Sequence, residues 1–111
     1  MGMRPEAAPA ELAMDALESV VSFAGKTEKL GVNEYLMLDQ LQRYPDEVMS
    51  RDALRRAIGV DDGTLADRRI DTWMRSLIRK VDVLHPRYSL VRFVPPDGYV
   101  YTWSPPPRIE T

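Results

Sequence analysis

Basic side chains are concentrated in residues 68–80, at spacings that a helix would turn toward a common side. The cations are Arg68, Arg69, Arg75, Arg79 and Lys80, and Asp71 is the acidic residue among them. Guanidinium groups on one helix face can neutralise the phosphates of a nucleic acid, although ordinary solvated helices also carry such faces. We take the following residues as candidate nucleic-acid contacts: Arg68, Arg69, Thr72, Arg75, Ser76, Arg79 and, further along the chain, Arg92.

Charge is distributed unevenly along the 111 residues. The formal net charge is −2 and the pI is about 5.4, which is unusual for a nucleic-acid-binding domain. Residues 1–50 hold four Lys/Arg and nine Asp/Glu, whereas residues 51–111 hold eleven Lys/Arg and eight Asp/Glu. The net charge is therefore −5 in the first half and +3 in the second. Only the second half offers a surface suited to a polyanion.

Other site chemistries find little support in the sequence. There is no cysteine, and His85 is the single histidine. Asp61, Asp62 and Asp67 lack the pattern of a calcium loop and are typical of a solvated turn. No phosphate-binding glycine loop, nucleophile motif or acid–base pair is present, so we expect a binding protein without a cofactor or metal rather than an enzyme. With neither a signal peptide nor a long apolar run, we expect a cytoplasmic protein without a membrane anchor.

Three helices are expected to position the basic residues. Apolar residues recur every three or four positions in residues 32–43, 51–58 and 68–84. Ser50 is a suitable N-cap for the second helix, and Gly59 is a suitable residue to end it. We expect Asp67 to cap the third helix and Pro86 to end it.

Strand-like alternation flanks these helices on both sides. Residues 11–30 predict two or three short antiparallel strands with a tight turn at Gly25-Lys26, and residues 47–49 predict an extended link. Residues 88–94 and 99–103 alternate around Pro95-Pro96-Asp97-Gly98, which predicts a hairpin. The fold class is therefore α+β, a winged helix-turn-helix with short N-terminal strands, three helices and a C-terminal hairpin wing. We expect a flexible tail over 1–9, the domain over 10–104 and a proline-rich tail over 105–111.

One hydrophobic core is expected beneath the third helix. The helical stripes and the last strand predict that five residues share it: Leu38, Leu54, Trp73, Leu77 and Tyr99. Alternate aromatic residues at 99, 101 and 103 could stack on bases, but they more often face a core. We therefore expect Trp103 to meet Trp73 in the interior and His85 to have a structural or exposed role.

Four motifs in order resemble the DNA-binding domain of OmpR/PhoB-type response regulators. The segments are residues 30–38 (LGVNEYLML), 50–54 (SRDAL), 68–74 (RRIDTWM) and Gly98-Tyr99. The corresponding family patterns are LTxxExxLL, SRexL, RxVDVHIxxLRxKL and TVRGxGY. The resemblance covers about residues 11–103. It implies a third helix that enters a DNA groove, with the hairpin as the wing.

Departures from the family pattern gather at the positions that contact DNA. The resemblance implies phosphate contacts for Arg68 and Arg75, both of which are retained. Ser76 stands where an arginine commonly reads a base, and Ile78 stands where an arginine meets the DNA backbone. Trp73 replaces a histidine. In the wing, the family's Thr, Arg and Gly are replaced by Phe93, Pro95 and Pro96.

Two functions follow from these observations. The first is a DNA-binding transcriptional regulator domain that holds duplex DNA mainly through phosphates, with two copies pairing on repeated sites. The second is a protein-interaction module that has lost specific DNA binding and presents an apolar patch of Ile78, Phe93 and Pro95. The resemblance also implies a contact with RNA polymerase or another protein through residues 60–67. The basic helix favours the first function, and the replaced arginines and low pI favour the second.

Overall fold

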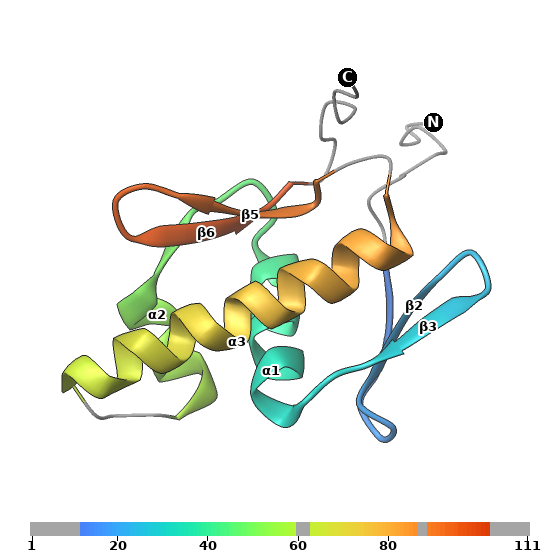
Figure 1. Ribbon diagram of the computed structural model, residues 1–111, viewed down its shortest axis with the longest axis horizontal. Coiled ribbons are helices and arrows are strands. Elements are labelled where there is room, and N and C mark those ends of the chain that lie inside the picture. Colours follow the sequence, from blue (N-terminus) through green and yellow to red (C-terminus); the bar gives the residue numbers. More distant parts are fainter. Residues whose placement is uncertain (1–11, 60–62, 87–88, 103–111) are drawn as a thin grey trace.

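The computed structural model describes residues 12–59, 63–86 and 89–102, with the backbone alone for residues 63–67. The elements follow one another as three strands, two helices separated by a short strand, a long helix and a hairpin (Figure 1). They are β1 (Ala13–Asp15), β2 (Val20–Phe23), β3 (Lys26–Lys29), α1 (Val32–Arg43), β4 (Met49–Ser50), α2 (Arg51–Ile58), α3 (Gly63–Leu84), β5 (Val91–Val94) and β6 (Gly98–Tyr101). This order is the α+β winged-helix plan predicted from the sequence.

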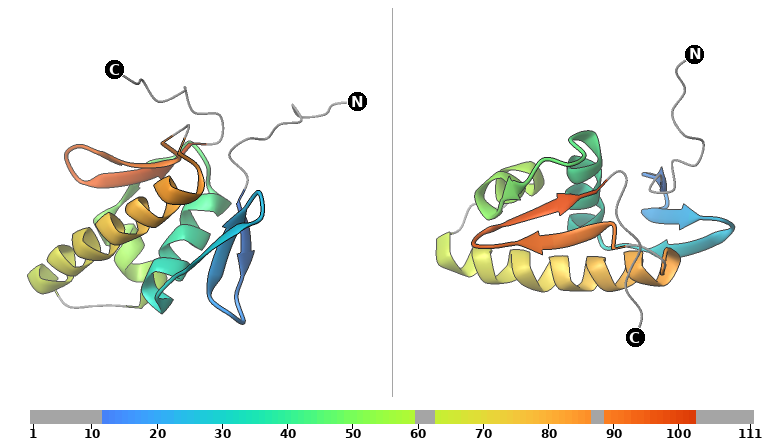
Figure 2. Two further views of the ribbon diagram at one scale, coloured as in Figure 1. Left: turned by 45° about the vertical axis from the view of Figure 1, so that its right-hand side comes forward. Right: turned by 90° about the horizontal axis from the view of Figure 1, so that it is seen from above.

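The long helix α3 connects the two ends of the domain. The hairpin of β5 and β6 lies along one side of α3, and the sheet of β1, β2 and β3 lies near its C-terminal end (Figures 1 and 2). Helices α1 and α2 pack against each other and against α3. The arrangement leaves one face of α3 open, on the side away from the core.

Local capping explains why α1 and α2 begin where they do. The carboxylate of Glu34 accepts a hydrogen bond from the backbone N–H of Gly31 at 2.8 Å, which satisfies a donor at the start of α1. Ser50 Oγ accepts one from the N–H of Ala53 at 3.1 Å. Gly59, with φ of 79°, ends α2 in the left-handed conformation that glycine adopts without strain. The bounds predicted for both helices are confirmed.

The start of α3 differs from the prediction. The helix begins at Gly63 rather than near Arg68, so Asp67 lies inside the helix and is not its N-cap. The apolar periodicity used for the prediction begins only at Ile70. It therefore does not reach residues 63–69, which explains the error. Although α3 has 22 residues, no helix in the described ranges is long and apolar enough to cross a membrane.

The N-terminal sheet has the antiparallel order β1-β2-β3. Phe23 pairs with Lys26, so the tight turn is made by Ala24 and Gly25, one residue earlier than predicted. Both residues have positive φ, 53° and 85°, as a two-residue hairpin turn compatible with strand twist requires. The three strands therefore form the compact unit that the alternation indicated.

The second sheet has the order β4-β6-β5 and contains the wing. Met49 pairs with Tyr99 and Ser50 with Gly98, so the expected link at 47–49 leads into a short strand. A Cβ on Gly98 would lie 2.5 Å from Val48 Cγ1 and 3.0 Å from the carbonyl oxygen of Met49. Glycine at this position therefore lets β4 approach the wing closely. The strands of the wing are shorter than predicted, 91–94 and 98–101.

A single core joins the helices to both sheets. Leu38, Leu54, Leu77 and Tyr99 are buried in one cluster, and Trp73 packs against it half-buried, as predicted. Tyr101 is fully buried too, so the aromatic side chains at 99 and 101 belong to the interior. The predicted contact between Trp73 and Trp103 lies outside the described residues, since Trp103 is not among them.

We predict that Leu77→Ala lowers the free energy of unfolding by about 2–5 kcal/mol, because it leaves a cavity at a fully buried site on α3. Chemical denaturation measures the loss. Val83→Ala is the matched control, since Val83 lies on the same helix with 54% of its surface exposed. Equal losses in the two variants would contradict the packing of α3.

Candidate nucleic-acid interface

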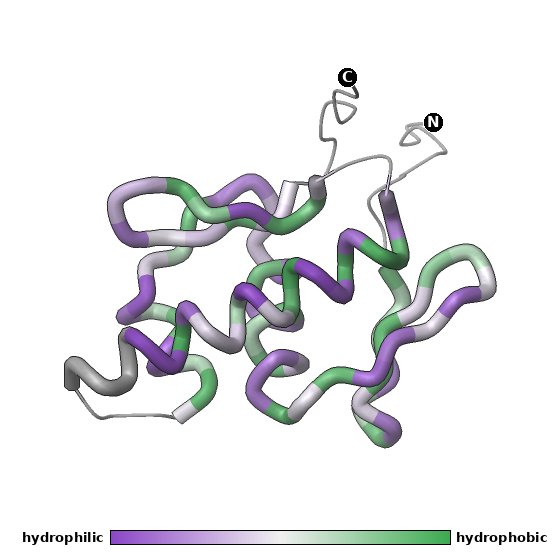
Figure 3. The backbone as a smooth tube through the Cα atoms, viewed as in Figure 1, coloured by the Kyte–Doolittle hydropathy of each residue, from purple (hydrophilic) through white to green (hydrophobic). Residues whose placement is uncertain are grey.

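The outward face of α3 carries a row of cations. The side chains of Arg68, Thr72, Arg75 and Arg79 are exposed and recur at helical spacing, and Arg69 is exposed beside them. Hydrophilic residues are interspersed with the hydrophobic ones along α3 (Figure 3). Thr72 Oγ1 donates to the carbonyl of Arg68 at 3.0 Å, so the hydroxyl lies close to the helix backbone. These residues of the predicted contact face are therefore exposed to solvent.

These arginines are not paired within the described part of the chain. No ion pair there involves Arg68, Arg75, Arg79 or the exposed Arg92 of β5. By contrast, the arginines at 55 and 56 of α2 both pair with Asp52. Arg68, Arg75, Arg79 and Arg92 thus keep their charge available to an external anion.

Two other polar residues of α3 are turned toward α1. Lys80 Nζ lies 2.8 Å from Glu34 Oε1, and the Glu34 side chain is almost fully buried. Burial would raise the pKa of Glu34, but hydrogen bonds from Lys80, Ser76 and Gly31 outweigh it and hold the pKa below its ordinary value. Ser76 is therefore half-buried and engaged with Glu34 at the border of the outward face. Lys80 is committed to an internal partner.

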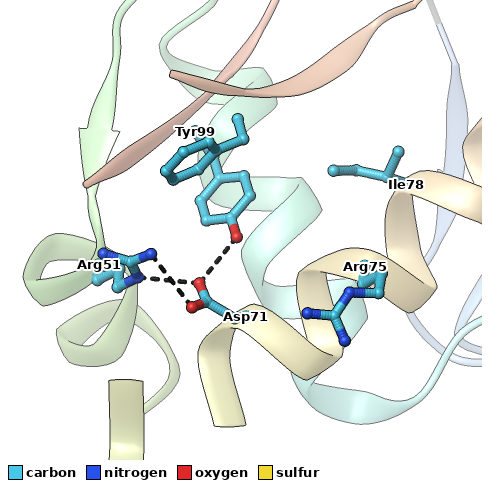
Figure 4. Close-up of a pocket in the computed structure, with 6 residues that line it drawn as sticks. Arg51, Asp71, Arg75, Ile78 and Tyr99 are labelled. Carbon is cyan, nitrogen blue, oxygen red and sulfur yellow. Dashed lines mark hydrogen bonds and ion pairs between the residues drawn. The ribbon is translucent and has the colours of Figure 1, made fainter. Parts of the chain in front are cut away.

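The opposite flank of α3 is joined to the wing by three side chains, Arg51, Asp71 and Tyr99, which we call the wing clamp. Arg51 donates from Nε and Nη2 to the two carboxylate oxygens of Asp71 at 2.9 and 3.1 Å. The Tyr99 hydroxyl donates to Asp71 Oδ1 at 2.8 Å (Figure 4). One carboxylate on α3 thereby connects the start of α2 to strand β6.

Arg51 also holds the turn of the wing. Its backbone N–H donates to the carbonyl of Asp97 at 3.1 Å, and Nη1 lies 3.4 Å from Asp97 Oδ1. The guanidinium lies 5.5 Å from the ring centroid of Phe93, which in turn packs edge-on against Tyr99 at 5.3 Å. The turn of the hairpin and the residue pair nearest to it are therefore held by one arginine.

Ionisation in the wing clamp follows from these contacts. Burial would raise the pKa of Asp71, but the hydrogen bonds from Arg51 and Tyr99 keep it below its ordinary value. Burial and the hydrogen bond to Asp71 raise the pKa of Tyr99 from 10.0 to about 12. The hydrogen bond to Asp71 raises the pKa of Arg51. Asp71 is therefore an anion, and Tyr99 a neutral donor, at neutral pH.

An open pocket of about 310 Å³ lies between α3 and the wing. It is lined by the wing clamp and by Arg75, Ile78 and Phe93. Two members of the predicted apolar patch thus meet here, and 40% of the Phe93 surface is exposed. Pro95 lines a different pocket with Val48 at the wing turn, so the three apolar residues do not form one patch.

The remaining sequence-predicted features lie elsewhere in the fold. His85 is buried at the end of α3 with its ring 4.4 Å from that of Phe23, which is a structural position. Of residues 60–67, the first three lie outside the described residues and the others form the start of α3. In the described ranges, no three His, Cys, Asp or Glu side chains gather as a metal site requires.

The wing clamp was not predicted from the sequence, although its residues occur in three of the four motifs that resemble the response-regulator family. Arg51 follows the cap Ser50, Asp71 follows Ile70, and Tyr99 follows Gly98. These positions are 20 and 28 residues apart along the chain, and no local pattern indicates their pairing. The signal that could have indicated the wing clamp is that all three residues stand in motifs that resemble the same family.

Comparison with known proteins agrees with this geometry. No family model matches the chain. The transcriptional regulatory protein BaeR of Escherichia coli O6:H1 is 30% identical over 102 residues, which are 92% of this chain and 42% of that protein. The chain therefore spans less than half the length of this curated relative.

Two solved structures show the same fold. The DNA-binding domain of the response regulator AdeR, in complex with an intercistronic region, has a TM-score of 0.69 at 19% identity and covers 82% of this chain and 93% of that chain. The DNA-binding domain of Klebsiella pneumoniae RstA, in complex with the RstA box, has a TM-score of 0.66 at 23% identity, with 84% and 92% covered. Fold and interface together define a winged-helix domain. More particularly, the chain has the fold of the DNA-binding domains of response regulators such as AdeR and RstA, which agrees with the resemblance noted in the sequence.

We predict that Tyr99→Phe removes a step near pH 12 from the ultraviolet titration of tyrosinate. Because the pKa of Tyr99 is raised in the folded chain, its contribution to stability is complete below pH 10 and is lost as the pH rises toward about 12. Circular dichroism at each pH shows whether the chain is still folded. Loss of a step near pH 10 instead would contradict the hydrogen bond to Asp71.

Proposed function

We propose that this chain is the effector domain of a cytoplasmic transcriptional regulator and binds duplex DNA through α3 and the wing. The fold supports the proposal, because α3 is exposed along one face and the hairpin lies beside it (Figure 2). The names of the relatives also support it, since both solved domains described above are DNA-binding domains bound to DNA. The activity is binding, not catalysis.

The observation that carries the proposal is the set of unpaired arginines. Arg68, Arg75 and Arg79 project from the outward face of α3, and Arg92 projects from the wing, with no ion pair among the described residues to neutralise them. Such side chains bind phosphates and position a protein on the duplex without reading its sequence. Net charge of the chain matters less than this local concentration of cations.

Base reading is expected to be weak. Ser76 stands at the position of a base-reading arginine, but its hydroxyl is engaged with Glu34. Even a free hydroxyl would discriminate poorly, since it can serve several bases. We therefore propose a micromolar affinity for a single domain at physiological salt, on the order of non-specific binding. Two copies on repeated sites would bind more tightly through effective concentration.

A contact with RNA polymerase through residues 60–67 belongs to the same proposal. It rests on the resemblance to the family and not on a geometry of those residues. Substitutions of Asp61 and Asp62 that reduce transcription while leaving DNA affinity unchanged would support it. If transcription is unchanged, the proposed contact with RNA polymerase is wrong.

We predict that Arg75→Ala weakens binding to every duplex about equally. With four phosphates neutralised, the logarithm of the affinity should fall with the logarithm of salt concentration at a slope of about −3.6. The variant should make this slope shallower by about one unit, because one phosphate contact is lost. Fluorescence anisotropy with genomic and random duplexes at several salt concentrations measures both. Arg43→Ala is the matched control, because Arg43 is exposed on α1 and pairs with Asp39. Tight, salt-insensitive binding to one sequence would contradict phosphate-dominated binding.

The pocket between α3 and the wing favours a second candidate function. Ile78 and the exposed Phe93 line it together, where the family has polar contact residues. A protein partner that inserts an apolar side chain there would explain both replacements.

We predict that Ile78→Arg separates the two candidate functions. If DNA is the partner, the added cation should strengthen binding, since it restores a phosphate contact. If a protein covers the pocket, the charge should weaken that complex, as measured by pull-down from the native host. A variant that changes neither property would show that the pocket is not a contact surface.

A further inference from the structure

The wing is attached to the body of the domain by a short strand pairing and by backbone hydrogen bonds from Asp46 to Tyr101 and from Arg51 to Asp97. Strand β6 pairs with β4 over only two residue pairs, Met49 with Tyr99 and Ser50 with Gly98. Beyond Gly98 lies the turn, whose residues 95–97 are all exposed. A two-stranded hairpin has little stability of its own, so its position relative to α3 depends on side-chain contacts, which include the packing of Val91, Tyr99 and Tyr101 in the core.

The wing clamp adds polar contacts at the turn end of the hairpin, where Tyr99 is the second residue of β6 and pairs with Phe93. Tyr99 connects β6 to Asp71 on α3, and Arg51 connects Asp71 to the turn at Asp97. Bidentate pairing between a guanidinium and a carboxylate fixes orientation as well as distance. The side chains of Arg51 and Asp71 are 23% and 32% exposed, so water screens the pair only in part.

We propose that the wing clamp sets the position of the wing relative to α3 and thereby lets both bind one duplex at the same time. Arg51, Asp71 and Tyr99 are then positioning residues that need not touch DNA. The inference rests on the proposed function, because it concerns how two DNA-contacting elements are held together. Phosphates along a duplex have fixed spacings, so an unfixed wing would forfeit its contact or bind at an entropic cost.

Asp71 provides the sharpest test, because two explanations predict opposite results. Considered alone, a carboxylate beside Arg75 repels phosphates, so its removal should strengthen DNA binding. In the wing clamp, the same carboxylate holds Arg51 and Tyr99, so Asp71→Asn should weaken DNA binding. We expect the affinity to fall by about two- to tenfold, the range of one or two lost hydrogen bonds.

A double-mutant cycle tests whether the effect passes through the wing. Tyr99→Phe removes only the hydroxyl that binds Asp71 and should weaken binding by a similar factor. Arg92→Ala should weaken binding of the wild type but not further weaken the Tyr99→Phe variant, since the wing contact is already lost. Arg75→Ala, on α3 itself, should lower affinity by the same factor in both backgrounds.

Tyr101→Phe is the matched control for a general loss of stability. It removes a buried hydroxyl from the same strand, and that hydroxyl accepts a hydrogen bond from Gln42 of α1. Its DNA affinity should stay within twofold of wild type. All variants are compared by fluorescence anisotropy on one duplex at one salt concentration, with thermal melts to show that each is folded.

The outcomes distinguish the inference from the proposed function. If the wild-type chain binds no duplex at low salt, the proposed function fails and the inference fails with it. If the wild type binds but Tyr99→Phe and Asp71→Asn bind as well or better, only the wing clamp is overturned. Additive effects of Tyr99→Phe and Arg92→Ala would also overturn it. Should Tyr99→Phe fail to fold, the cycle of Asp71→Asn with Arg92→Ala decides by the same criterion.

Discussion

The ion pair between Arg51 and Asp71 is the interaction that joins the start of α2, the long helix α3 and the wing. Arg51 is the first residue of α2, directly after the cap Ser50, so its backbone direction is fixed by the helix start. Its guanidinium then meets α3 at Asp71 and the wing turn at Asp97. Losing Asp71 would leave the buried Tyr99 hydroxyl without its acceptor and Arg51 with only the longer contacts to Asp97 and the Pro96 carbonyl, which costs more than the pair itself contributes.

Different sides of the long helix α3 contact different parts of the domain. One side carries the core residues, and one flank carries Asp71 and Ile78 toward the wing. The other flank carries Ser76 and Lys80 toward buried Glu34. Among the residues of α3 that the structure describes, only those on the remaining side include arginines outside any ion pair. The number of residues available for DNA is therefore smaller than the number of basic residues in the segment.

Much of the fold, but less of the interface, follows from the sequence. Periodicity and caps such as Ser50 and Gly59 are local signals, and they located α1 and α2 correctly. The pairing of β4 with β6 joins residues about 50 positions apart, and that of Lys80 with Glu34 spans 46, so no local pattern contains them. A helical wheel places Ser76 beside the outward arginines. It cannot show that a buried carboxylate from α1 competes for the serine hydroxyl.

A DNA-binding surface with few base-reading groups depends on the relative placement of its elements to fit a duplex. A surface with many such groups depends on that placement less. When several bidentate base contacts are present, each fixes the register of the protein on the duplex. Here the outward groups are mainly arginines, whose contacts with phosphates tolerate displacement. The relative placement of α3 and the wing then becomes the main constraint on how the surface fits a duplex. In the proposed complex with DNA, the hydrogen bonds among Arg51, Asp71 and Tyr99 would hold α3 and the wing together and so lower the entropic cost of binding with both elements.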